Sequence, residues 1–195
     1  QRTASGHELA HGRRLDVHWR TMKAKELFAY LVHMRGAAVT KDALLEMLWP
    51  DADLSKAMVN LHTTVYQLRR SLKAAGVPAP IDYVDGAYRL AGESMRIEAD
   101  LWERELDRCR AGGAETVRER LRLLLTDYRG DYFEQEGYLW AENERERLRV
   151  RWLEHARETA EHLEREEDPG DAIRLYQRMQ EMFPLQEDSY LGPMR

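Results

Sequence analysis

The most regular alternation of apolar and polar positions lies between residues 54 and 75. At about 100° per residue, one narrow stripe of a helix is apolar and is formed by Leu61, Val65, Leu68 and Leu72. Polar and basic side chains face the other way, namely Thr63, Gln67 and Arg70, with Tyr66 beside them. The pattern predicts a long amphipathic helix that Asp53 or Ser55 can cap and that ends before Gly76.

Shorter patterns predict a hairpin and two helices before this segment. Residues 7–19 suggest two short strands, because Gly12 marks a turn and an alternating apolar face follows at Leu15, Val17 and Trp19. Helices are expected over residues 22–34 and 41–49. A threonine precedes each of them, so we expect Thr21 and Thr40 to serve as N-caps.

The strongest local signal is the decapeptide IDYVDGAYRL, residues 81–90. Asp85-Gly86 between two β-rich runs predicts a hairpin with a type I′ turn. That register pairs Ile81 with Leu90, Asp82 with Arg89, Tyr83 with Tyr88 and Val84 with Ala87. Aromatic then faces aromatic and acid faces base, so the cross-strand pairs support the register.

From Ile97 onward the pattern is helical. Helices are expected over residues 101–110, with Asp100 as the cap, then over 114–128, 138–166 and 169–183. The third of these carries a regular apolar face made of Leu148, Trp152, Ala156, Ala160 and Leu163. The spacing of small and apolar residues from Ala156 to Pro184 resembles one tetratricopeptide repeat. We therefore expect an all-α, tetratricopeptide-like second domain.

The charge of the chain divides at the same place. The net charge is −5, but residues 1–90 carry a balance of +4 and residues 91–195 one of −9. The last lysine is Lys73. The expected domains are therefore a basic domain over residues 1–92 and an acidic helical one over residues 97–195, and the basic one is the candidate for nucleic-acid binding.

The order of these motifs resembles known transcription factors. The helix with LRRSL followed by IDYVDGAYRL resembles the winged-helix DNA-binding domain of two-component response regulators. With WRTMKAKELFAYLVH, LLEMLWPDADLSKAMVNLHTTVYQLRRSLK and YRGDYFEQEGYLWAENERERLR, residues 7–190 resemble the SARP family of antibiotic-regulatory transcription factors. The resemblance implies an α+β winged helix, then a bacterial transcriptional activator domain, in an activator that works with RNA polymerase. A receiver domain often precedes this arrangement, so the sequence could be the C-terminal part of such a regulator, and we expect the helical domain to be truncated after Pro184.

The winged-helix resemblance implies that the helix over residues 55–75 enters the major groove of double-stranded DNA. The expected DNA-binding residues are Thr63, Thr64, Tyr66, Gln67, Arg69, Arg70, Lys73 and Arg89. Gln67 stands where related proteins usually have arginine, and an amide suits adenine better than guanine. Thr64 and Arg69 are expected on the flanks, near the phosphates. Asp85 lies at the tip of the wing, where related proteins often have glycine or arginine.

Two other classes of function compete with this one. An enzyme is not expected, because the sequence lacks GxSxG, a phosphate loop, HExxH and CxxC, and no cofactor or metal site is expected either. The alternative to a DNA-binding regulator is a helical-repeat scaffold whose winged helix binds protein. The single cysteine, Cys109, suits a cytoplasmic location, and no membrane segment is expected. The sequence leaves open whether the chain forms a homodimer.

Overall fold

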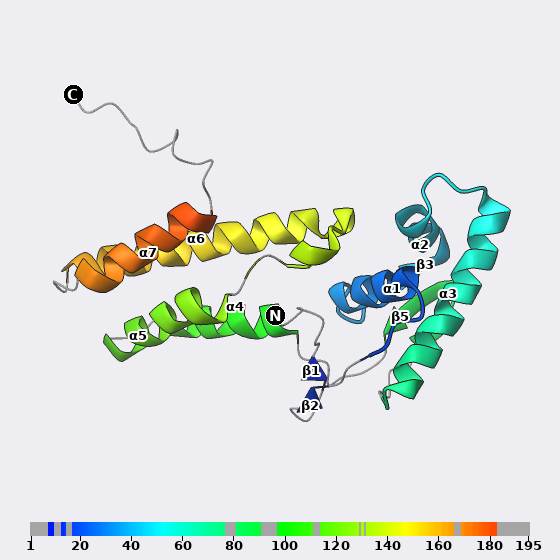
Figure 1. Ribbon diagram of the computed structural model, residues 1–195, viewed down its shortest axis with the longest axis horizontal. Coiled ribbons are helices and arrows are strands. Elements are labelled where there is room, and N and C mark those ends of the chain that lie inside the picture. The colour runs from blue at the N-terminus through cyan, green and yellow to red at the C-terminus, as the bar shows by residue number, and fades with distance from the viewer. Residues whose placement is uncertain are drawn as a thin grey trace. The chain divides into compact units, whose positions relative to one another are not determined.

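The computed structural model describes residues 8–9, 13–14, 17–76, 81–90, 97–110, 114–128, 130, 132–165 and 169–182. Its contacts divide the chain into two compact units. We refer to Gln1–Glu98 as the N-terminal unit and to Ala99–Arg195 as the helical unit. Figure 1 shows the elements of both.

The helices of the N-terminal unit begin and end close to where the sequence predicts. They are α1 (Met22–His33), α2 (Lys41–Leu48) and α3 (Leu54–Ala74). Thr21 caps α1 by accepting from the backbone N–H of Ala24 at 3.1 Å, and Thr40 caps α2 in the same way. Asp53 precedes α3 without a capping bond, because its carboxylate accepts from the Ser55 hydroxyl instead, at 2.5 Å. The threonine caps are confirmed, and α3 starts without one.

A small antiparallel sheet completes this unit. Its strands are β3 (Val39–Thr40), β4 (Ile81–Val84) and β5 (Ala87–Leu90), in the order β3-β5-β4. The hairpin register is the predicted one at all four pairs. Asp85 and Gly86 have φ values of 50° and 80°, as a type I′ turn requires. Strand β3 was not predicted, since two residues are too short for an alternating pattern.

The hairpin predicted near the N-terminus is shorter than expected. Strands β1 (Glu8–Leu9) and β2 (Arg13–Arg14) pair in an antiparallel manner, whereas Gly12 and Leu15 lie outside the described residues. The prediction of a strand through Val17 and Trp19 is wrong, because residues 17–19 have no strand partner. Both side chains are nevertheless half-buried against the core, and the Trp19 ring lies 5.3 Å from that of Phe28.

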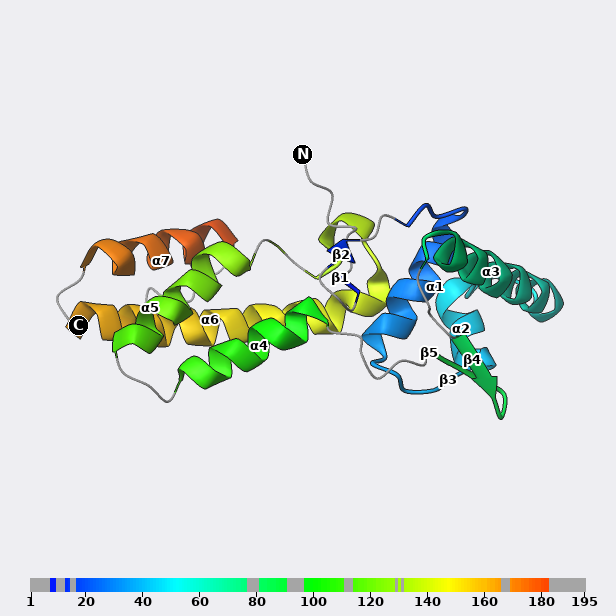
Figure 2. The same cartoon turned by 90° about the horizontal axis from the view of Figure 1, so that it is seen from below.

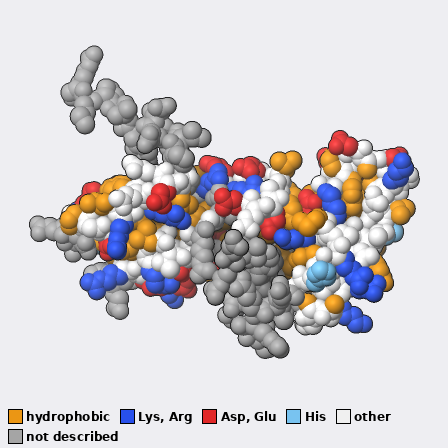
Figure 3. Space-filling model, viewed as in Figure 1, with side chains coloured by type: hydrophobic (Ala, Val, Ile, Leu, Met, Phe, Trp, Pro, Cys, Tyr) orange, Lys and Arg blue, Asp and Glu red, His pale blue; other side chains and the backbone are white. Residues whose placement is uncertain are grey.

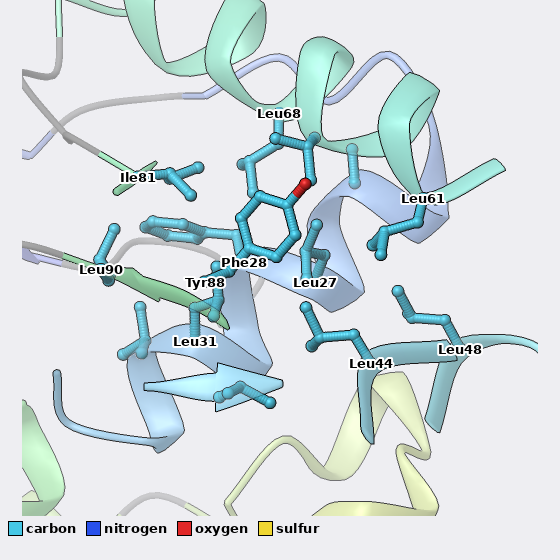
Figure 4. Packing of buried hydrophobic residues seen from close by; sticks show 14 of the residues in the cluster. Leu27, Phe28, Leu31, Leu44, Leu48, Leu61, Leu68, Ile81, Tyr88 and Leu90 are labelled. Carbon is cyan, nitrogen blue, oxygen red and sulfur yellow. The ribbon is translucent and has the colours of Figure 1, made fainter. Parts of the chain in front are cut away.

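One apolar core joins the helices of this unit to its sheet. The close-up in Figure 4 shows Leu27 and Leu31 of α1, Leu44 of α2, Leu68 of α3 and Tyr88 of β5 converging. All four residues of the predicted α3 stripe are buried to 4% exposure or less. Full burial of a leucine is worth about 1.5–3 kcal/mol, so the stripe fixes the rotation of α3 about its own axis.

Four α-helices form the described part of the helical unit, the first of which starts one residue before it: α4 (Glu98–Cys109), α5 (Ala114–Arg122), α6 (Glu142–Arg165) and α7 (Pro169–Met182). Figure 2 shows α7 running beside α6. The predicted apolar face of α6, from Leu148 to Leu163, is buried as expected. The prediction that Asp100 caps α4 is wrong, because the helix already begins at Glu98 and places Asp100 inside its first turn.

A π-helical turn, η1 (Leu123–Asp127), continues α5 into the core. The indole N–H of Trp102 donates to the carbonyl oxygen of Leu123, and that of Trp152 donates to Leu124, both at 3.1 Å. Tyr128 lies within ring contact of both indoles. The Leu123 carbonyl oxygen also accepts from the N–H of Tyr128 at 3.2 Å, so the two indoles tie this turn to α4 and α6 in addition to its own backbone bond.

A buried arginine organises the segment before α6, which includes the short turns η2 (Glu134–Glu136) and η3 (Leu139–Ala141). Arg145 donates to the carbonyl oxygens of Tyr132, Phe133 and Tyr138 at 2.8–3.1 Å, and to the Glu142 carboxylate at 2.6 Å. A planar guanidinium can serve several acceptors at once, so one side chain holds the whole segment against α6.

His155 gives the helical unit a dependence on pH. The side chain is 1% exposed, and burial, followed by repulsion from Arg151, lowers its pKa below the ordinary value of 6.5. The other charged neighbours are Asp107 of α4, Arg110 just after α4, Arg120 of α5, and Glu158 of α6. Below pH 6.5 the unfolded chain therefore binds a proton that the native state resists, and stability falls as the pH falls.

We expect His155→Gln to flatten the loss of stability between about pH 7.5 and 5.5, because glutamine does not titrate. Urea denaturation of the full chain at stepped pH measures the effect. His62→Gln, at an exposed position of α3, is the matched control and should keep the wild-type slope. Equal slopes for wild type and His155→Gln would contradict this account.

Candidate nucleic-acid interface

The surface of α3 opposite the core stripe is the candidate interface. Thr63, Tyr66, Arg69, Arg70 and Lys73 are all exposed there, Tyr66 to 58%. In Figure 3, blue and orange side chains mix along the α3 side of this unit, and red ones lie near the loop before α3. That loop holds acidic residues at positions 51 and 53. The basic part of the helix is therefore its C-terminal half.

The adjacent arginines of α3 have different surroundings. The guanidinium of Arg69 donates to the carbonyl oxygen of Ile81 at 2.6 Å, which ties α3 to the first residue of β4. Arg70 is exposed and has no protein partner within the described part of the chain. Arg69, which the sequence placed on a flank near the phosphates, thus has a structural contact as well, whereas Arg70 faces solvent on the outward side of the helix.

Two predicted contact residues lie elsewhere than expected. Thr64 does not lie on an exposed flank, because the structure buries it to 6% exposure. It follows Leu61 by three residues and so belongs to the edge of the core face. Gln67 lies on a flank and is half-buried. Its Oε1 is buried and has no hydrogen-bond partner among the described residues, so the amide presents only part of its donor and acceptor set outward.

The hairpin carries the remaining candidate, Arg89. Its guanidinium pairs with the Asp82 carboxylate across the strands at 3.4 Å, and both groups are partly exposed. The ammonium of Lys41, at the start of α2, lies 4.6 Å from the centre of the exposed Tyr83 ring. A hydrogen bond with Tyr83 raises the pKa of Lys41, so this cation stays charged beside the hairpin. No sequence pattern pointed to Lys41, because its proximity to the hairpin arises only in the folded chain.

A contact between main chains connects the helices to the turn of the hairpin. The N–H of Lys41 donates to the carbonyl oxygen of Gly86 at 3.2 Å. Strand β3 pairs with β5 immediately before it, through Val39 and Tyr88. Together with the Arg69 bond, these links hold the hairpin at two points, so the hairpin and α3 form one surface.

Val59 is the exposed residue that sequence reasoning missed. It is 65% exposed and lies on the same helix face as Thr63 and Tyr66, at spacings of four and seven residues. Its position opposite the apolar stripe was a usable signal, since an amphipathic helix rarely needs a valine on its polar side.

The described residues show no sign of two other kinds of site. No three His, Cys, Asp or Glu side chains among them gather closely enough to hold a metal ion. Equally, none of the described helices is both long enough and apolar enough to cross a bilayer.

Comparisons with known proteins agree with this geometry. Residues 16–90 match the family model described as transcriptional regulatory protein, C terminal. A solved structure of Mycobacterium tuberculosis EmbR, in complex with a low-affinity phosphopeptide, is similar with a TM-score of 0.61 and 20% sequence identity. The similarity covers 93% of this chain but only 57% of the EmbR chain. A search of curated proteins found no match.

The EmbR likeness, at this low identity, is evidence for the fold. It extends across both units of the present chain, whereas the family match is confined to the N-terminal one. Residues 16–90 thus form a winged-helix domain of the type found at the C-terminal end of transcriptional regulatory proteins, and a mostly helical unit follows it.

Proposed function

We propose that this chain is a sequence-specific transcription regulator that binds double-stranded DNA through α3. The observation that carries the proposal is the exposed face of α3, where Arg70 and Lys73 point away from the core. The major groove of B-DNA is about 12 Å wide and accepts one α-helix. A helix whose opposite face is anchored in a core can enter it without losing any packing.

The hairpin supports this role as a second contact with DNA. Arg89 and Lys41 are cations at or beside the hairpin, and the Arg69–Ile81 bond fixes the hairpin relative to α3. When a winged helix places one helix in the major groove, its hairpin, or wing, lies within reach of the adjacent sugar-phosphate backbone of the DNA. Asp85 at the turn tip disfavours deep insertion next to phosphates, so we assign the hairpin to contacts along the backbone.

The finer assignment rests on the SARP resemblance. We propose a cytoplasmic activator whose helical unit is a bacterial transcriptional activator domain with a tetratricopeptide-like repeat formed by α6 and α7. Its acidic charge suits contact with protein rather than with DNA, and RNA polymerase is the proposed partner. Ile173 and Tyr176 of α7 are 54% and 38% exposed, which leaves an apolar surface for a homodimer. A receiver domain earlier in the parent protein would place it under two-component control.

The alternative is a scaffold whose winged helix binds protein. One observation favours it: Val59 and Tyr66 expose apolar surface on the outward face of α3. The charge of this face disfavours the scaffold, because Arg70 and Lys73 lie on the same face and favour binding of a polyanion such as DNA.

Binding to duplex DNA should weaken steeply with salt. Fluorescence anisotropy with a random duplex should give a linear fall of log affinity with log salt concentration, because phosphate contacts release counterions. Arg70→Ala should lower this slope by about one unit. Arg165→Ala, at an exposed position of the helical unit, is the matched control and should leave the slope unchanged. A chain that binds no duplex at low salt would refute the proposal and favour the scaffold.

The two adjacent arginines should differ in their effect on stability. Arg69→Ala removes a charged donor from the Ile81 carbonyl and should lower the free energy of unfolding by about 1–3 kcal/mol. Arg70→Ala should change it by no more than about 0.5 kcal/mol, since its side chain is exposed. Urea denaturation of both variants provides the comparison. Equal losses would show that the Arg69 bond does not hold the hairpin.

A further inference from the structure

The outermost line of α3 is apolar, although basic residues surround it. Val59, Thr63 and Tyr66 follow one another at spacings of four and three residues and therefore share one face. Val59 is 65% exposed and Tyr66 is 58% exposed. These three residues form what we call the apolar line.

Thr63 contributes mainly a methyl group to the apolar line. Its hydroxyl donates to the carbonyl oxygen of Val59, four residues earlier, at 3.0 Å. This back-bond is common for threonine in helices and uses the only donor of the side chain. The side chain therefore has no free donor to offer a ligand.

The charges around the apolar line indicate what covers it. Arg70 and Lys73 follow the line on the same side of the helix, whereas Lys56 precedes it next to the acidic loop residues Asp51 and Asp53. At about 1.5 Å per residue, Lys56 and Arg70 are separated by roughly 21 Å. A basic C-terminal half that continues an apolar strip matches a ligand that presents phosphates beside apolar groups, which describes a DNA groove better than a protein surface.

Only one base presents an apolar group at its edge in the major groove. Thymine carries a C5-methyl group there, whereas the edges of the other bases present hydrogen-bond donors and acceptors. Resting on the proposed DNA-binding function, we propose that Val59, Thr63 and Tyr66 recognise thymine methyl groups. The preferred DNA site then has thymines at the positions that the apolar line faces, and base preference comes from methyl contact more than from the partly buried amide of Gln67.

Uracil substitution isolates the methyl groups. A duplex obtained by binding-site selection from a random pool is made again with uracil in place of every thymine, which removes the C5-methyl groups and keeps all hydrogen-bonding edges. The wild-type chain should bind the uracil duplex more weakly, by about fourfold for each methyl group that the apolar line touches. Val59→Ala should weaken binding to the thymine duplex and reduce the difference between the two duplexes.

Val150→Ala is the matched control for the valine substitution. Val150 is a similarly exposed valine, at 46%, on α6 of the helical unit. This variant should keep the wild-type difference between thymine and uracil duplexes. Because Val59 is exposed, its truncation removes little packing, and an unchanged salt dependence with random duplex shows that the variant is folded.

A second pair of variants tests the role of Thr63. Thr63→Val keeps the methyl group and removes a hydroxyl that is already bonded to the Val59 carbonyl, so binding to the thymine duplex should stay close to that of wild type. Thr63→Ser keeps the hydroxyl and removes the methyl group, so its binding should weaken by about fourfold. The opposite order would show that the hydroxyl contacts DNA and would overturn the assignment of Thr63.

The outcomes separate this inference from the function on which it rests. Salt-dependent duplex binding with equal affinity for thymine and uracil would overturn the inference and leave the DNA-binding function intact. A thymine preference that persists undiminished in Val59→Ala would also overturn it. The absence of any duplex binding would overturn the proposed function itself, and the inference with it.

Discussion

The burial of the apolar face of α3 is the constraint on which the N-terminal unit depends. Leu61 and Leu68 are fully buried, and they contact side chains from α1, α2 and the sheet in one core. A helix held along most of its length cannot rotate without exposing leucine to water. The identity of the buried residues therefore determines which residues face outward, and the outward face of α3 follows from its inward one.

This dependence explains why the sequence predicted the helix well and its outward face less well. Three leucines and a valine define a stripe, but the structure also buries Ala57, Thr64 and Ser71, which lie to one side of it. Including these three turns the buried face by about 30°. The solvent-facing side of α3 turns by the same angle. Val59 then lies at the centre of that side, and Gln67 lies at its flank. Small residues carry little hydrophobic signal, so their burial depends on neighbours that the sequence pattern does not identify.

Several features determined by local chemistry were predictable, although the caps proposed at Asp53 and Asp100 are not formed. The Asp85-Gly86 turn, the cross-strand pairs and the Thr21 cap each depend on a few adjacent residues, and the structure has them as expected. Strand β3, the π-helical turn and the contacts of Arg145 depend on residues distant in sequence. The carbonyl oxygens of the π-helical turn, for example, accept from the indole N–H groups of Trp102 and Trp152. No periodicity in residues 114–128 could indicate such partners.

The two neighbouring arginines show how one surface can hold a structural contact and an exposed positive charge side by side. A cation that contacts phosphate must be exposed, yet a cation that fixes a hairpin must give up part of its solvation to a protein acceptor. Residues next to each other on a helix point about 100° apart, so adjacent positions can meet both demands. Arg69 turns toward Ile81 and Arg70 turns away. The Arg69 bond therefore links the hairpin to α3, and Arg70 next to it stays on the solvent-facing side of the same surface.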